Sequence, residues 1–264
     1  MAAKKIWVTW LPGDNNQKEL HATIQALQVV GLDVNGAPWI DDLEKAVWTE
    51  LADMLSGSDA PELWLVAGRA EDFVAPRIRY ALSLISANLI ERAPNAKVFV
   101  QGIDNKGVGD LPLLLAHWSP LDTSSGWNAK IVAAAYGTAA QKPELDFHFS
   151  VIAHSHIGQW FEVGPAKGSE AWKGAMFGIN GDDTELAFQA VGDRGQLPEK
   201  SVNEFASMGI EADIAEQKYT ACALQNNISD QQSYFIKVKG HPDNIMFGGH
   251  PGTDDAEVTV VNLT

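Results

Sequence analysis

Short apolar runs alternate with stretches of helical periodicity along the first half of the chain. Five runs have the length, bulk and flanking turn residues of strands; they cover residues 5–10, 32–34, 63–67, 97–101 and 111–117. Between them apolar residues recur at intervals of three and four, which is typical of amphipathic helices. A further helical pattern covers residues 127–136. The chain therefore begins with strands and helices in alternation.

That alternation predicts the fold class of the first half. Parallel strands need crossover connections, and right-handed crossovers place helices on both faces of the sheet. We therefore predict an α/β domain over residues 1–141 with a doubly wound, flavodoxin-like parallel sheet of five strands in the order 2-1-3-4-5. Its second helix is expected to begin near Asp41, with Leu43, Val47, Leu51 and Met54 on one face.

The second half changes to strands separated by turn residues. Segments of alternating or β-branched character cover residues 147–161, 172–179, 185–191, 219–224, 234–239 and 257–261. Glycine-rich or aspartate-rich turns punctuate them, as at residues 180–183. The pattern predicts a β-rich domain over residues 146–264, closed as a sandwich or a barrel, with one helix around residues 202–208.

Composition narrows the classes of function. The 264 residues are 45% hydrophobic and 20% charged, as in globular proteins, and no apolar run approaches the length of a membrane span. With a net charge of −15 the chain would repel phosphate backbones, so we expect no nucleic-acid partner and no membrane. The single cysteine, Cys222, excludes an internal disulfide and is expected to be buried and inert. The start of the chain lacks a secretory pattern, so we expect a cytoplasmic protein.

A ligand site is expected where the predicted sheet reverses its winding. In open α/β sheets, ligands bind beyond the carboxyl ends of the strands. Here that edge would hold Trp10 and Asp14 after strand one, Trp39 after strand two, and Gly68 and Arg69 after strand three. No glycine-rich phosphate fingerprint follows strand one, so a dinucleotide bound in the Rossmann manner is not expected.

The tryptophans are numerous, nine in all. Trp7, Trp64 and Trp172 fall within strand patterns and are expected in the core. Trp10, Trp39 and Trp127 lie at the ends of elements, where an indole can stack on a ligand or a partner.

Several segments of the first half together resemble the TIR domain family. Trp7-Val8-Thr9-Trp10 followed by Asp14 is similar to its opening strand. Residues 31–39 resemble its second strand and the loop that follows, and residues 62–67 its apolar third strand. Residues 110–115, followed by Leu121-Asp122, resemble its late proline-containing strand.

The resemblance implies self-association and docking to protein partners in signalling. It also implies NAD cleavage in members that carry a glutamate on the helix after strand three. Here that helix carries Arg77 and Arg79, cations where the cleavage chemistry needs a carboxylate. Glu71 and Asp72 lie just before it and are the candidate catalytic acids, with NAD as the candidate nucleotide and cofactor.

Histidines suggest a second kind of site. His148, His154 and His156 share one face of an unbroken strand, opposite an apolar face, and His154 and His156 are close enough to share a zinc ion. His241 or His250 would add a ligand, and the glycine- and acid-rich segment 241–255 is either a ligand loop or, as we favour, a long turn. The alternative for the three histidines is a solvated strand face.

Three hypotheses of function follow from the sequence. The first is a TIR-like signalling or defence protein that acts through self-association and protein contacts, with the β-rich domain sensing or anchoring. The second is an NAD glycohydrolase that uses an acid near the reversal point of the sheet. The third is a binding module for a sugar or another small ligand.

Overall fold

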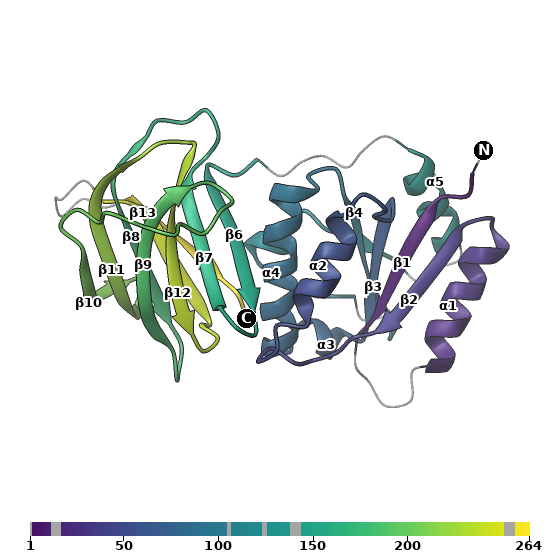
Figure 1. Cartoon of the computed structure of the whole chain (residues 1–264). Coiled ribbons are helices and arrows are strands. Elements are labelled where there is room, and N and C mark those ends of the chain that lie inside the picture. The colour runs from purple at the N-terminus through teal and green to yellow at the C-terminus, as the bar shows by residue number, and fades with distance from the viewer. Residues whose placement is uncertain (1, 12–16, 105–106, 123–125, 138–143, 251–256) are drawn as a thin grey trace. The chain divides into compact units, whose positions relative to one another are not determined.

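The computed structural model describes residues 2–11, 17–104, 107–122, 126–137, 144–250 and 257–264. The chain divides into two compact units, Met1–Pro143 and Glu144–Thr264 (Figure 1). Each unit has its own sheets and its own core.

The first unit is built on a parallel sheet. Its strands are β1 (Lys5–Trp10), β2 (Asp33–Pro38), β3 (Leu63–Gly68), β4 (Lys97–Gly102) and β5 (Ser119–Leu121). They are hydrogen-bonded in the order β2-β1-β3-β4-β5, and every neighbouring pair is parallel. The predicted fold class and strand order are confirmed.

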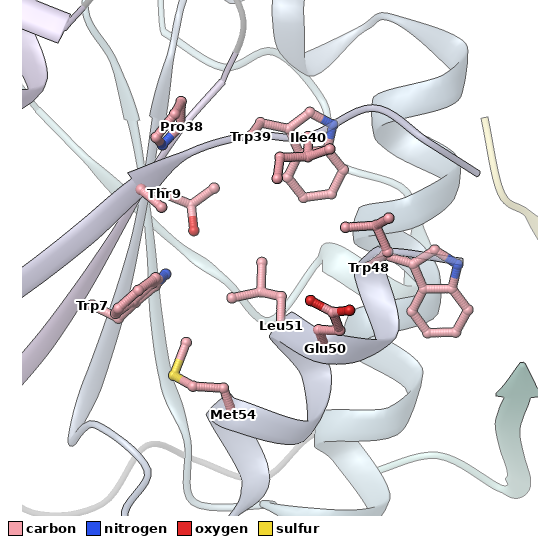
Figure 2. Close-up of a pocket in the computed structure, with 11 residues that line it drawn as sticks. Trp7, Thr9, Pro38, Trp39, Ile40, Trp48, Glu50, Leu51 and Met54 are labelled. Carbon is pink, nitrogen blue, oxygen red and sulfur yellow. The ribbon is translucent and has the colours of Figure 1, made fainter. Parts of the chain in front are cut away.

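Helices cover the two faces of this sheet. They are α1 (Gln17–Val29), α2 (Trp48–Ser56), the short α3 (Ala70–Phe73), α4 (Pro76–Arg92) and α5 (Trp127–Tyr136). Ile6, Val8 and Trp10 of β1 share a core with residues of α1 and α5. Successive strand residues point to opposite faces, so Trp7 and Thr9 face the other side, toward α2 (Figures 1 and 2).

Two predicted elements of this unit are wrong in position. Residues 111–117 do not form the fifth strand; Leu113–Leu115 is a 3-10 turn that follows Pro112 and buries Leu114 and Leu115. The fifth strand is Ser119–Leu121, at an edge where Pro120 is tolerated. A short apolar run can be buried as a strand or as a 3-10 turn, so the apolar pattern of residues 111–117 does not distinguish the two.

The second helix begins later than its periodicity predicts. Turns occupy residues 43–47, and α2 starts at Trp48 instead of near Asp41. Ala46 has a φ of 52°, in the left-handed region, which a helix does not contain. Asp42 accepts a hydrogen bond from the backbone N–H of Lys45 and stabilises the turn in place of a helical start.

The second unit is a β-sandwich. One sheet has the order β10-β11-β8-β13-β14 and the other β6-β7-β12-β9, all antiparallel. The bounds are β6 (Phe147–His154), β7 (Gly158–Pro165), β8 (Trp172–Asn180), β9 (Glu185–Asp193), β10 (Ser207–Ile214), β11 (Gln217–Ile228), β12 (Gln232–Lys239), β13 (Asn244–Gly249) and β14 (Glu257–Asn262).

Aromatic rings join the two sheets of the sandwich. Phe247 of β13 contacts Phe147 and Phe149 of β6, with ring centroids 5.0 and 5.7 Å apart. Phe177 of β8 contacts Phe161 of β7 at 5.6 Å. Of the two closures left open by the sequence, the structure has the sandwich.

Three predictions in this unit are corrected. The run 147–161 is two strands, because a turn follows His154 and Gly158 takes a positive φ of 75°. Residues 202–208 form no helix; they lead irregularly into β10, held where Glu204 accepts a backbone hydrogen bond from Gln225. The segment 241–255, favoured as a long turn, contains β13.

Candidate functional site

The carboxyl edge of the parallel sheet gathers most of the predicted ligand residues. Trp10 pairs in register with Pro38 and Ala67, so β1, β2 and β3 end at the same level. The backbone N–H of Trp39 donates to the carbonyl of Trp10 at 2.7 Å. Gly68, Arg69, Glu71 and Asp72 follow directly from β3. Asp14 lies outside the described residues.

Proximity at this edge does not make all of these side chains available. The Trp10 side chain is 4% exposed and packs in the core with α1 and α5 residues, so its indole stabilises the fold. Gly68 leaves no room for a side chain, since an added Cβ would lie 2.8 Å from the Cβ of Leu11. The Trp39 side chain is half-buried on the other face of the sheet.

The two candidate acids have different surroundings. A carboxylate oxygen of Asp72 accepts a hydrogen bond from the backbone N–H of Arg69 at 2.7 Å and caps α3. Burial raises the pKa of the Asp72 carboxyl, the Arg69 hydrogen bond opposes that rise, and the charge of Glu71 adds to it. Glu71 itself pairs with the Arg69 guanidinium at 3.4 Å, and its side chain is 74% exposed.

The arginines of α4 are held by neighbouring elements. Arg77 forms ion pairs with Asp41 and Glu44, at 3.1 and 3.3 Å. Arg79 donates to the carbonyl oxygens of Phe73 and Asp110. These contacts fix the segment around 41–44 and the loop after β4 against the start of α4, so both cations have structural partners.

A cavity of this unit lies beside that edge, between β1 and α2 (Figure 2). Its volume is about 210 Å³. Three segments line it: β1, the end of β2 with the two residues that follow, and α2 with the turn before it. The lining residues are Trp7, Thr9, Ala37, Pro38, Trp39, Ile40, Val47, Trp48, Glu50, Leu51 and Met54. We call this cavity the α2 pocket.

The packing of α2 explains why the α2 pocket stays open. Its Trp48, Ala52 and Leu55 are buried, and α2 packs against α4. Leu51 and Met54 therefore look across a gap toward Trp7, as Figure 2 shows. Of the predicted face, Leu51 and Met54 lie on α2 and line the α2 pocket; Val47 lines it from the turn before the helix, and Leu43 is buried elsewhere.

Polar groups of the α2 pocket are few. Thr9 lines the pocket, and its hydroxyl accepts a hydrogen bond from Trp64 Nε1 at 2.9 Å. Among the described residues, the buried Nε1 of Trp39 has no hydrogen-bond partner. Glu50 is the only charged residue of the lining.

The charge of Glu50 is uncompensated within the described structure. In the segment just before α2, Asp41 and Glu44 bind Arg77, and Asp42 binds Lys45 at 2.8 Å. No described cation pairs with Glu50, which is exposed at the end of the first turn of α2. An apolar cavity with one carboxylate at its mouth has the composition of a small-molecule site.

Sequence reasoning missed most of this pocket. It predicted Trp39 as a ligand residue but placed Trp7 in the core, and it singled out neither Trp48 nor Glu50. The signal was present: Trp7 has the opposite parity to Ile6, Val8 and Trp10, so it had to face the other side of the sheet.

His154 and His156 are adjacent at the end of β6. Their ring centroids are 5.2 Å apart, and His154 Nδ1 accepts a hydrogen bond from the backbone N–H of His156 at 3.2 Å. The described residues contain no group of three His, Cys, Asp or Glu side chains arranged to hold a metal ion. The zinc hypothesis stays a prediction without a third ligand.

His148 belongs to a different environment. It is 3% exposed, so it lies on no solvated face, and its Nε2 is 3.1 Å from the carboxylate of Glu162, itself 1% exposed. Ser150 and the backbone N–H of Gly195 also donate to Glu162. Burial alone raises the pKa of Glu162, but His148 and Gly195 lower it more, so the pKa lies below its ordinary value.

The outward face of the sheet β10-β11-β8-β13-β14 forms a second apolar surface. One row crosses all five strands in register: Ile210, Ala221, Gly178, Met246 and Val260. It belongs to a separate cluster in which Tyr219, Ala221 and Met246 are buried, and Ile210, Ile214, Val258 and Val260 are partly buried against them. We call this surface the outer apolar face.

The outer apolar face differs from an ordinary sheet surface. Phe177 and Phe247 face inward in the sandwich, so their neighbours Gly178 and Met246 face outward. Antiparallel sheets with one solvated face alternate apolar and polar residues, whereas this one is apolar on both sides. An added Cβ on Gly178 would lie 2.7 Å from Met246 Cε, so glycine lets Met246 lie across the row.

Comparison with known proteins assigns no family: no family model matches the chain, and no curated protein matches it in sequence. In the described parts of the chain, no helix combines the length and hydrophobicity needed to cross a bilayer.

Proposed function

We propose that this protein acts by associating with other protein chains, and that its main partner is a second copy of itself. The partly exposed apolar side chains of the outer apolar face carry this proposal; they surround the buried Tyr219, Ala221 and Met246 and are Met176, Ile210, Ala212, Ile214, Val258 and Val260. Large apolar patches on a folded surface usually mark contact sites, because exposing them to water is unfavourable. A TIR-like signalling role, suggested by the strand order and by the segments that resemble that family, remains part of the proposal.

Charge favours a second copy of this chain as the partner. At a net charge of −15, two copies repel each other over most of their surfaces. A two-fold contact places the same patch opposite itself, so a charged patch would oppose like charges. The row Ile210, Ala221, Gly178, Met246 and Val260 contains no charge and is complementary to its own copy.

From the sequence we expect the α/β unit to associate and the β-rich unit to sense or anchor. The proposal exchanges these two roles. The sandwich unit carries the broad apolar surface and would associate. The α/β unit carries the α2 pocket and would sense a ligand.

The test is the molecular mass of the purified protein over a wide range of concentration, by sedimentation equilibrium. We expect a dimer whose population rises with concentration. Ile210→Glu and Val260→Glu alter the two edge strands of the face, where both side chains are partly exposed. Each should weaken the dimer by about tenfold or more, because a buried unpaired carboxylate is costly.

A matched control separates this effect from a general gain of charge. Val202→Glu adds the same charge at an apolar residue that is 81% exposed and outside the outer apolar face. It should leave the dimer unchanged. Thermal unfolding of all three variants checks their folding. A protein that stays monomeric up to its solubility limit would refute the proposal.

NAD cleavage, the second hypothesis, stays a prediction with little geometric support. Asp72 is engaged in capping α3, and Glu71 extends into solvent beside Arg69. Incubation with NAD and measurement of released nicotinamide decides the point, with Glu71→Gln as the variant that should abolish any release observed.

A further inference from the structure

We infer that the α2 pocket binds a small organic cation, such as a quaternary ammonium group or a positively charged aromatic ring. This inference does not depend on self-association, because the pocket and the outer apolar face lie in different units.

Aromatic faces supply the first part of the argument. In Figure 2 the indoles of Trp7 and Trp39 flank the gap, one from β1 and one from the segment after β2, with Leu51 opposite. The face of an indole carries negative potential and attracts cations, most strongly when water is excluded. Two indoles and an aliphatic wall therefore line the gap.

Glu50 supplies the second part. Its carboxylate stands beside Leu51 on the same side of α2 (Figure 2). Three acids in the segment just before α2, Asp41, Asp42 and Glu44, are paired with Arg77 or Lys45, whereas Glu50 lines the pocket and has no cation partner among the described residues. Charge and ring faces therefore select the same sign of ligand, and the net charge of −15 attracts cations to the whole surface.

Size limits the ligand further. A volume of about 210 Å³ is below the range usual for drug-sized ligands, so it fits a headgroup or a single ring and not a dinucleotide. The group bound is therefore a trimethylammonium or a pyridinium-sized ring, free or at the end of a longer molecule that continues into solvent past Glu50.

The experiment compares choline with 3,3-dimethyl-1-butanol, which has the same shape but a carbon in place of the charged nitrogen. Binding to the full chain is measured by calorimetry at low ionic strength, with N-methylpyridinium as the ring-shaped probe. We expect at least one of the two cations to bind, and choline to bind more tightly than the neutral isostere, by roughly fivefold.

Variants then assign the binding to this pocket. Glu50→Gln should weaken cation binding roughly two- to fivefold and leave the neutral isostere unaffected, since an exposed charge contributes modestly. Glu44→Gln removes a carboxylate outside the pocket lining that is paired with Arg77, and it should change cation binding less. Trp7→Leu should weaken the binding of both cations. Glu50 is exposed, so Glu50→Gln should fold normally and can be interpreted even if the tryptophan variant folds poorly.

Two results would overturn the inference. One is equal binding of choline and its neutral isostere, which would make the pocket a plain apolar site. The other is failure of both cations to bind. Neither bears on self-association, which sedimentation measures separately.

Discussion

The α2 pocket and the outer apolar face are both apolar regions, yet they differ in shape, burial and charge: the pocket is open, whereas Tyr219, Ala221 and Met246 at the centre of the face are buried. The pocket is concave, bordered by tryptophans, and has Glu50 at its mouth. The outer apolar face extends across five strands, and its central row has no charge. The difference is the reason that we propose two kinds of partner, a small charged group for the first and a second copy of the chain for the second.

The largest expected effect compares the two sides of one strand, β13. Phe247→Ala removes a ring that contacts Phe147, Phe149 and Phe177 and should cost about 3–5 kcal/mol of unfolding free energy. That cost should not depend on protein concentration. Met246→Ala, on the outer side, should cost about 2–3 kcal/mol, with a part that grows with concentration as dimers form.

Urea unfolding at two protein concentrations measures both variants. If the cost of Met246→Ala is the same at both concentrations, the outer apolar face is not an interface. Phe247→Ala serves as the positive control, because its large loss of stability shows that urea unfolding can measure the effect of a core substitution.

The next effect compares two faces of α2. Leu55 is 3% exposed and packs within the fold, so Leu55→Ala should cost about 2–4 kcal/mol. Leu51 lines the α2 pocket, where part of its surface already lacks contacts, so Leu51→Ala should cost about 1 kcal/mol or less. Equal costs in thermal or urea unfolding would mean that the pocket closes in solution.

A smaller effect concerns the buried pair of the sandwich. The pKa of Glu162 lies below its ordinary value of 4.5, so the ionised form stabilises the fold. That contribution is present above the unfolded-state pKa and is lost as the pH falls through the lower folded-state value. Glu162→Gln should cost about 1–3 kcal/mol at neutral pH.

The pH dependence gives this prediction its control. Below pH 4.5 the stability of the wild-type protein should fall toward that of Glu162→Gln. Glu185→Gln removes an exposed partner of Lys239 and should change stability little at any pH. Parallel curves for wild type and Glu162→Gln would show that the buried pair does not titrate.

The smallest expected effect concerns the reactivity of the Cys222 thiol in the native and the unfolded protein. Burial raises the pKa of the Cys222 thiol to about 12, and the Tyr234 hydroxyl donates a hydrogen bond to its sulfur. We expect no reaction with a thiol reagent in the native protein and complete reaction after unfolding. Rapid labelling of the native protein, followed by mass spectrometry, would mean that the sandwich opens readily.

The sequence predicts the first unit well because its pattern and its topology agree. Alternating strands and helices permit few windings, so the order β2-β1-β3-β4-β5 follows from general rules. The errors occur where two structures satisfy one pattern. Leu113–Leu115 is an apolar run that a 3-10 turn buries as well as a strand would, and the periodicity of Leu43 and Val47 continues through a turn.

The sandwich unit is harder to predict because its glycines have several roles. Gly248 and Gly249 suggest a turn, yet both lie in β13, where any side chain on Gly248 would collide with the carbonyl of Glu257. Cys222 was correctly expected to be buried. The outer apolar face was not foreseen, because its residues come from five strands whose pairing no local pattern specifies.

The candidate site was predictable in part. The rule for open sheets locates Trp10, Trp39 and Gly68 at one edge, and the structure agrees. The α2 pocket was not predictable from the sequence. It forms because α2 packs against α4 and leaves the part of the sheet beside Trp7 uncovered. Such an offset depends on tertiary packing, which the spacing of residues within one helix does not encode.

The row across the outer apolar face also sets an order of events during biosynthesis. Its residues are translated from Gly178 to Val260, and β14 supplies the final edge. A nascent chain on the ribosome therefore exposes only an incomplete row until β14 emerges. Until then the edge of β13 lacks its β14 partner, and unpaired edges of this kind make incomplete chains prone to associate, so the last strand also completes the protection of the sheet.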